Sequence, residues 1–297
     1  MRILVSGATG LIGGALRSAL IDRGDTVVTL TRRPRQAPAP AVGWDLSTGH
    51  LEAGALEDVD AVIHLAGEGI AATRWNEAHK RRVLESRTLS TKLLADALAA
   101  SARPPRVFIS ASAIGFYGHR GDARLDEGSE RGQGFLSDVC VAWEAAAEPA
   151  RAAGIRVVHP RIGIVMAPDG GALDKMLLPF KMGLGGRVGS GRQYMSWIGL
   201  SDVVGLVLHA LDREVEGPLN VTAPEPVTNA DFTHALGTAL NRPTLVPLPA
   251  FAAKVALGSE MAEALLLSST RAVPQKALDT GFTFQEPDLP TLLRSML

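Results

Sequence analysis

Three glycines near the start of the chain have a spacing that can bind a phosphate group. The segment Gly7-Ala8-Thr9-Gly10-Leu11-Ile12-Gly13 has the pattern G-x-x-G-x-x-G. It lies between a short apolar run, 2–6, and a segment with apolar residues at helical spacing, 11–23. Backbone N–H groups at a helix start can receive a pyrophosphate, and glycine allows the close approach that this requires. We therefore expect a dinucleotide-binding turn rather than a bare structural turn.

The end of the second predicted strand, 26–31, carries two cations. An acidic residue at this position would bind a ribose 2′-hydroxyl, whereas arginine accommodates a 2′-phosphate. Arg32 and Arg33 follow the strand, with no acidic side chain beside them. Two guanidinium groups can form charge-assisted hydrogen bonds to one phosphate. The sequence predicts NADP(H) as cofactor, and the alternative is two solvated loop arginines.

The elements that would position these residues alternate between strand and helix. Predicted strands cover 2–6, 26–31, 61–65, 106–110 and 156–159, and predicted helices cover 11–23, 77–100 and 139–153. Such alternation implies parallel strands joined by right-handed crossovers, with helices on both faces. We expect an α/β fold with a Rossmann-type, doubly wound parallel sheet.

The second half of the chain has a different pattern. Glycine is dense over 168–191, and prolines interrupt the last part of the chain. A predicted helix at 202–211 and a predicted strand at 217–221 indicate that part of this half returns to the first sheet. We expect a nucleotide-binding domain over 1–165, joined by 202–222. The ranges 166–201 and 223–297 would form a smaller, mostly helical substrate-side region and C-terminal domain.

Composition excludes several classes of protein. The chain has 297 residues, 46% of them hydrophobic and 21% charged, which is ordinary for a globular protein. Its 30 basic and 31 acidic residues nearly cancel, so no global field attracts nucleic acid or an anionic membrane. We expect a small-molecule substrate and neither of those partners; the choice between monomer and homodimer stays open.

The cysteine content and the apolar runs indicate where the protein is located, and the spacing of the histidines indicates whether it binds a metal. Cys140 is the only cysteine, which excludes an intramolecular disulfide and fits the reducing cytoplasm. No apolar run of about 18 residues indicates a membrane span, and the N-terminal run is too short for a signal peptide. The seven histidines show no metal-ligand spacing, so no metal is expected.

Further motifs give the chain a family resemblance. With His64-Leu65-Ala66-Gly67 and Pro160-Arg161-Ile162-Gly163, it resembles the extended short-chain dehydrogenase/reductases, which include nucleotide-sugar epimerases and dehydratases. Other segments are similar to an epimerase-like branch that carries a small C-terminal domain of unknown function. These segments are Arg74-Trp75, Ser86-Arg87, Ser112 to Gly118, Pro179-Phe180, Gly183 to Gly186, Gly189 to Gln193, Gly258 to Met261 and Pro274 to Lys276.

The resemblance implies a set of cofactor contacts. Gly7, Thr9, Gly10, Leu11, Ile12 and Gly13 match the phosphate turn. Asp45 and Leu46 match the adenine-side pair, and Leu65, Ala66 and Gly67 match the turn beneath the adenine ribose. Ser110, Ala111 and Ser112 match the end of the strand that carries the catalytic serine. Arg161 and Gly163 match the point where the chain passes the nicotinamide.

One part of the family pattern is absent. Hydride-transferring members hold a Tyr-x-x-x-Lys on the helix that follows, where the lysine lowers the tyrosine pKa for proton transfer. Alignment through Glu144 places Leu136 and Cys140 at these two positions, and neither can do this chemistry. Arg87 falls where ordinary members place an active-site asparagine, so we expect its cation to replace part of the lysine's role. The alternative is a surface arginine paired with a carboxylate.

Three other side chains are candidates for the proton carrier. Ser112 either polarises a substrate carbonyl or bonds backbone at a strand end. Tyr117 either replaces the missing acid or shapes the substrate pocket, which we favour. Glu68 either acts as acid or base or bonds backbone or a ribose hydroxyl. We expect an NADP(H)-dependent oxidoreductase or epimerase for a small polar, sugar-like substrate; the alternative is an NADPH sensor without turnover.

Overall fold

The N-terminal apolar run forms the central strand of a large sheet in the computed structural model, which describes residues 1–297. In β1 (Arg2–Ser6), Ile3 and Val5 pack into one hydrophobic cluster and Leu4 packs into another. Side chains of a strand alternate between the faces of its sheet, so this alternation means that both faces are covered.

The sheet has nine strands and is parallel except at one edge. Its order is β13-β9-β6-β5-β1-β2-β3-β4, with β7 paired to β9, and only β4 runs antiparallel to its neighbour. The other strands are β2 (Thr26–Thr31), β3 (Ala41–Asp45), β4 (His50–Leu51), β5 (Ala61–His64), β6 (Val107–Ser110), β7 (Ser112–Ala113), β9 (Arg156–Ile162) and β13 (Gly217–Val221).

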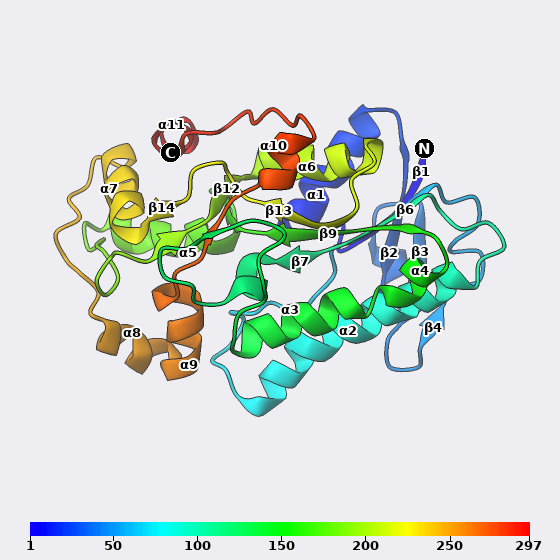
Figure 1. The fold of residues 1–297 in the computed structure, drawn as a ribbon, viewed down its shortest axis with the longest axis horizontal. Helices are drawn as coiled ribbons and strands as arrows, with labels where there is room; N and C mark the ends of the chain where they lie inside the picture. Colours follow the sequence, from blue (N-terminus) through cyan, green and yellow to red (C-terminus); the bar gives the residue numbers. More distant parts are fainter.

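Helices cover the two faces of this sheet (Figure 1). The cluster on one face includes side chains of α1 (Leu11–Asp22) and α6 (Leu200–Asp212). The cluster on the other face includes side chains of α2 (Glu77–Ala99) and α4 (Glu148–Ala152), and α3 (Phe135–Ala145) packs beside α2. The expected α/β fold with a doubly wound parallel sheet is confirmed.

A third cluster forms the core of the mostly helical second part. Leu173 and Phe180 of α5, Phe232 of α7 and Leu292 of α11 meet there around Trp197. The elements of this part are β10 (Ile164–Met166), α5 (Gly171–Lys181), β11 (Tyr194–Met195), β12 (Trp197–Gly199), β14 (Val227–Thr228), α7 (Asn229–Ala239), α8 (Ala250–Leu257), α9 (Ser259–Ala262), β15 (Arg271–Ala272), α10 (Gln275–Asp279) and α11 (Leu289–Met296). β15 pairs with β8 (Arg124–Leu125).

Several element bounds differ from the expected ones. The predicted helix 139–153 starts earlier, at Phe135, and is interrupted before Pro149, which occupies the first turn of α4. The glycine-dense range 168–191 contains helix α5, which the glycines at its two ends concealed. β3 was not expected after the proline-rich loop that precedes it.

Part of the second half does return to the sheet. β13 pairs in parallel with β9, and α6 packs against α1. The proposed division of the chain at residue 165 stays a prediction. None of the helices combines the length and the apolar character that crossing a bilayer requires.

Candidate functional site

The glycine turn after β1 has no room for side chains at two positions. Gly7 has a φ of +71°, and a Cβ there would lie 2.8 Å from the Leu65 carbonyl carbon. A Cβ on Gly13 would collide with the Gly7 carbonyl oxygen. Thr9 and Gly10 are exposed, and no side chain caps the N-terminus of α1. The turn therefore presents backbone N–H groups, as a pyrophosphate site requires.

The two arginines beyond β2 are free of carboxylate partners. Arg32 and Arg33 are both exposed, and neither has a carboxylate oxygen within 4.0 Å. On the neighbouring strand end, Asp45 Oδ1 accepts hydrogen bonds from the Ser47 N–H and hydroxyl. These bonds lower the pKa of Asp45. Leu46 packs on the adjacent core cluster.

The turn after β5 packs against the glycine turn and carries a buried cation beneath it. A Cβ on Gly67 would lie 3.2 Å from Arg87 Cζ. Arg87 Nη1 donates to the carbonyl oxygens of Glu68 and Val83, each at 3.0 Å. The guanidinium also lies 5.0 Å from the centre of the Trp143 ring. Arg87 has no carboxylate within 4.0 Å, so the surface ion pair considered above is absent.

Glu68 follows this turn and has a fixed backbone. Its N–H donates to Ser86 Oγ at 3.0 Å, and its carbonyl oxygen accepts from Arg87. Its partly exposed side chain has no hydrogen-bond partner in the protein. The carboxylate is therefore available to a ligand. Leu65 and Ala66, between β5 and Gly67, are also partly exposed.

A buried ion pair lies behind the strand end that carries Ser112. The Arg161 guanidinium donates to both carboxylate oxygens of Glu144, at 2.8 and 2.9 Å. Ser112 Oγ donates to Glu144 Oε1 at 2.7 Å. Burial raises the pKa of Glu144, but the hydrogen bonds and charge of Arg161 outweigh it, so that the pKa lies below its usual value. Ser112 and Arg161 are thus bound to the same carboxylate.

Tyr117 extends this network to β13. Its hydroxyl donates to Asn220 Oδ1 at 2.7 Å and accepts from Arg161 Nη1 at 3.0 Å, and its side chain is 0% exposed. Burial raises the pKa of Tyr117. A hydroxyl held in this way is poorly placed to reach a substrate. The geometry favours the pocket-shaping role of Tyr117 over proton transfer.

Glu127 connects the network to the C-terminal part. Its Oε1 accepts from the Asn220 N–H at 2.9 Å, and its Oε2 accepts from the Lys276 N–H at 3.1 Å. Burial raises the pKa of Glu127. The sequence reasoning used Glu144 only as an alignment anchor and missed Glu127 and Asn220. The one available signal was a polar Asn220 inside an otherwise apolar strand.

The two positions of the absent tyrosine and lysine lie against the loop after β7. A Cβ on Gly115 would lie 3.3 Å from Leu136 Cβ and 3.7 Å from Cys140 Sγ. Burial raises the pKa of the Cys140 thiol to about 11, while the nearby Arg87 charge lowers it. The thiol is therefore neutral, and Arg87 is the cation whose charge acts on it.

Two buried histidines contact serines at the ends of β1 and β6. His64 lies between the hydroxyl groups of Ser6 and Ser90, at 2.6 and 2.9 Å, and burial lowers its pKa to about 3. His159 contacts the Ser110 carbonyl oxygen and Arg151, and burial lowers its pKa to about 4. Both rings are neutral and serve packing. No three side chains of His, Cys, Asp or Glu gather into a metal-binding group.

The remaining predicted cofactor contacts lie on neighbouring strand ends. Ser110 and Ala111 are buried, and the Ser110 hydroxyl has no hydrogen-bond partner. Gly163 follows β9, where a Cβ would lie 2.5 Å from the Ser196 carbonyl oxygen. The fold thus gathers the predicted residues at the carboxyl edge of one sheet, where doubly wound folds bind their ligands.

Comparison with known proteins places this geometry in a family. The model of the NAD dependent epimerase/dehydratase family matches residues 3–222, and a domain of unknown function, DUF1731, matches residues 248–296. Epimerase family protein Mb2239 of Mycobacterium bovis is 44% identical over 285 residues, which cover 95% of this chain and 93% of that protein. Human epimerase family protein SDR39U1 is 38% identical over the full length of both chains.

Solved structures agree with this assignment. The crystal structure of human SDR39U1 with NADPH superposes with a TM-score of 0.89 at 36% identity, covering 100% of this chain and 99% of that one. A nucleoside-diphosphate sugar epimerase from Corynebacterium glutamicum has a TM-score of 0.82 at 34% identity, covering 100% of this chain and 58% of that one. The resemblance inferred from the motifs is confirmed, and with it a nicotinamide dinucleotide as the cofactor of the family. This chain belongs to the NAD dependent epimerase/dehydratase family and carries a C-terminal DUF1731 domain.

Proposed function

We propose that this protein binds NADP(H) and moves a hydride to or from a small polar substrate, as an oxidoreductase or an epimerase. One observation carries the cofactor choice. The glycine turn lies at the end of β1, and Arg32 and Arg33, both without carboxylate partners, follow the adjacent β2. Guanidinium groups in this position suit the 2′-phosphate that distinguishes NADPH from NADH.

The chain's own residues divide the work of holding this cofactor. The free N–H groups at the start of α1 would bind the pyrophosphate, and the turn 65–67 would support the adenine ribose. Arg87, buried beneath Gly67, would supply the positive charge that the family's lysine provides elsewhere. When bound, the nicotinamide ring supplies or accepts the hydride.

Glu68 is the proton carrier in this proposal. Tyr117 is enclosed by Arg161 and Asn220, and the hydroxyl hydrogen of Ser112 is donated to Glu144. Glu68 alone of the three candidates has a side chain without a protein partner. Its carboxyl group would exchange a proton with the substrate, while Ser112 would accept a hydrogen bond from the substrate.

The cofactor assignment is tested by calorimetric titration of arginine variants. Arg32→Ala and Arg33→Ala should each weaken NADPH binding about ten- to a hundredfold, because one charge-assisted hydrogen bond contributes roughly 1.5 to 3 kcal/mol. NADH binding should barely change. Arg35→Ala, also exposed and nearby, is the matched control. Equal losses for NADH and NADPH would exclude the 2′-phosphate assignment.

The presence of Leu136 and Cys140 at the usual catalytic positions favours a second function, an NADPH sensor without turnover. Incubation of the purified protein and NADPH with carbonyl compounds and nucleotide sugars separates the two. Glu68→Gln should lower any turnover about a hundred- to ten-thousandfold and leave NADPH affinity nearly intact. Stable NADPH binding with no turnover across the panel would support the sensor.

The proposal also includes a cytoplasmic location, which suits a single, buried thiol.

A further inference from the structure

Exposed apolar side chains are concentrated on one part of the molecule. Twelve large apolar side chains are exposed in the whole chain, and eight of them lie between residues 178 and 255. They are Leu178, Met182, Leu184, Leu245, Val246, Leu248, Phe251 and Val255. We call these eight residues the apolar face. Monomeric proteins rarely expose so many apolar groups together, and such patches mark interaction sites.

The eight side chains come from segments that contact one another. Leu178 lies in the last turn of α5 and Met182 directly follows this helix, and Phe251 and Val255 are one turn apart on α8. Between them, the Leu248 N–H donates to the Arg187 carbonyl oxygen at 2.9 Å. Arg242 Nε donates to the carbonyl oxygen of Lys181, at the end of α5, at 3.0 Å. These bonds join the end of α5, the loop of Arg187 and the segment before α8, and the ribbon shows α5 and α8 in the same half of the molecule (Figure 1).

The same segments carry a local excess of positive charge. Ranges 174–192 and 241–258 contain six basic residues and one acidic residue, Asp174. The basic residues are Lys175, Lys181, Arg187, Arg192, Arg242 and Lys254. Only Lys254 is paired, with Glu263 at 2.5 Å, and the other five have no carboxylate within 4.0 Å. These two ranges therefore carry an excess of positive charge in a molecule whose net charge is -1.

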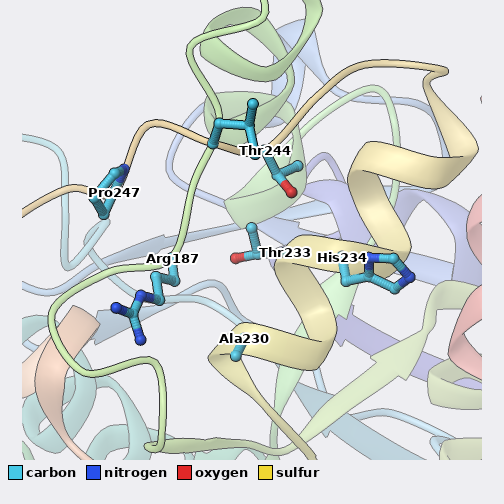
Figure 2. Close-up of a pocket in the computed structure, with 7 residues that line it drawn as sticks. Arg187, Ala230, Thr233, His234, Thr244 and Pro247 are labelled. Carbon is cyan, nitrogen blue, oxygen red and sulfur yellow. The ribbon is translucent and has the colours of Figure 1, made fainter.

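An open pocket with a mixed polar and apolar lining lies beside the apolar face (Figure 2). It has a volume of about 310 Å³ and lies between the loop of Arg187, helix α7 and the segment 244–247. Arg187, Thr233 and Thr244 line it, the His234 ring is directed away from Arg187 (Figure 2), and Leu245 joins the pocket to the apolar face. A guanidinium and two hydroxyl-bearing side chains beside one space are suited to a phosphate ester.

We propose that the apolar face docks on the surface of an anionic lipid bilayer, with a lipid phosphate in the pocket beside Arg187. Apolar side chains ringed by basic ones bind at the level of the headgroups, where each cation strengthens attachment. Leu245, Phe251 and Val255 are 83%, 71% and 73% exposed, so they project outward instead of lining a groove. Projecting side chains suit a deformable bilayer.

Charge argues against a second copy of the chain on this face. A twofold dimer places the same surface patch on both partners, so the unpaired cations of the two copies would meet. An anionic bilayer neutralises them instead. Docking of this kind needs neither a spanning helix nor a global positive charge. It is therefore compatible with the features that led us to expect no membrane partner.

Vesicle sedimentation with the full-length protein tests the proposal. The probes are vesicles of phosphatidylcholine alone and vesicles with one third phosphatidylglycerol. Each cation at an anionic surface strengthens binding about fivefold, so Lys181, Arg187 and Arg242 together predict about a hundredfold preference for the anionic vesicles. That preference should vanish when salt rises from about 0.01 M to about 1 M.

Variants identify the surface that binds. Phe251→Ser with Val255→Ser should abolish sedimentation, and Arg187→Gln with Arg242→Gln should weaken it about 25-fold. Leu89→Ser on α2, where the side chain is 50% exposed, is the matched control and should change nothing. NADPH titration of each variant verifies that the fold is intact. Inorganic phosphate, added at constant ionic strength, should not release the protein from the vesicles.

Several results would overturn the proposal. They are equal sedimentation with neutral and anionic vesicles, unchanged binding by the variants of the face, or release by inorganic phosphate. Analytical ultracentrifugation tests whether a second copy of the chain binds this face instead. A wild-type dimer that Phe251→Ser with Val255→Ser converts to a monomer, without vesicle binding by either, would assign the face to a second copy.

Discussion

Ser112 donates the only hydrogen of its hydroxyl group to Glu144, at 2.7 Å, and Glu144 is held as an anion by the two-pronged contact with Arg161. While this carboxylate is ionised, Ser112 has only lone pairs to offer a ligand. In the proposed function, Ser112 would therefore accept a hydrogen bond from a substrate hydroxyl group instead of donating one to a carbonyl.

This arrangement predicts a large difference between two variants. Glu144→Ala leaves the Arg161 guanidinium buried without its partner and should reduce the free energy of unfolding by about 3 to 5 kcal/mol. Ser112→Ala removes one hydrogen bond to a charged group and should cost about 1.5 to 3 kcal/mol. Urea denaturation measures both. Equal costs would show that the ion pair contributes little.

Tyr117→Phe tests whether this hydroxyl is structural. Its loss leaves Asn220 Oδ1 and one Arg161 N–H without their partner in a buried site, so the free energy of unfolding should fall by about 1 to 3 kcal/mol. Any turnover found with Glu68 intact should persist within a few-fold. Loss of turnover with unchanged stability would instead restore Tyr117 as the proton carrier.

The glycine turn offers a matched pair of substitutions. A Cβ on Gly13 collides with the Gly7 carbonyl oxygen, so Gly13→Ala should abolish NADPH binding in fluorescence titration. Gly14 is the next residue of α1, and its Cβ would lie 3.9 Å from the nearest atom, the Ala8 carbonyl oxygen. Gly14→Ala should keep NADPH affinity and add about 0.5 to 1 kcal/mol of stability. Similar behaviour of the two variants would contradict the steric argument.

Arg87→Met tests the buried cation beneath Gly67. If its charge replaces the family's lysine, NADPH affinity should fall about tenfold or more, since a hydrogen bond to a charged group contributes roughly 1.5 to 3 kcal/mol. Arg87→Lys keeps the charge and should recover part of the affinity. Unchanged affinity in Arg87→Met would leave the arginine a packing role beside Trp143.

Stability should depend on pH through the two buried histidines. The folded pKa values of His64 and His159, about 3 and about 4, lie below the ordinary value of 6.5. The unfolded chain therefore binds more protons below pH 6.5, and stability falls as pH falls towards 4. Two such groups predict a loss of roughly 5 kcal/mol between pH 6.5 and 4.5.

Denaturation curves at several pH values measure this slope. His159→Gln keeps one donor and one acceptor, for the Ser110 carbonyl oxygen and Arg151, and should roughly halve the slope. His50→Asn changes an exposed ring and serves as the control. A slope unaffected by His159→Gln would mean that other groups cause the acid sensitivity.

The sheet could be predicted from local sequence patterns, whereas contacts between residues far apart in the sequence could not. Strands, crossover helices and the glycine turn follow from residue spacing within short windows, and β1 is buried on both faces as its apolar run indicates. By contrast, Tyr117 and Asn220 are 103 residues apart, and no local pattern pairs them. For the same reason, Ser112 and Arg161 could be predicted as site residues from the sequence, but their shared contact with Glu144 could not.

The contact of Glu127 with Asn220 on β13 and with the Lys276 N–H has a consequence for how the molecule can be rebuilt. The carboxylate belongs to one part of the chain, and its two partners belong to a sheet strand and to the C-terminal domain. Because the donor at Lys276 is a backbone N–H, a chimera that exchanges only the C-terminal domain keeps this partner if its backbone follows the same course there and has no proline at that position. Since both N–H donors to Glu127 belong to the backbone, the contact constrains the path of the exchanged chain more than its side chains.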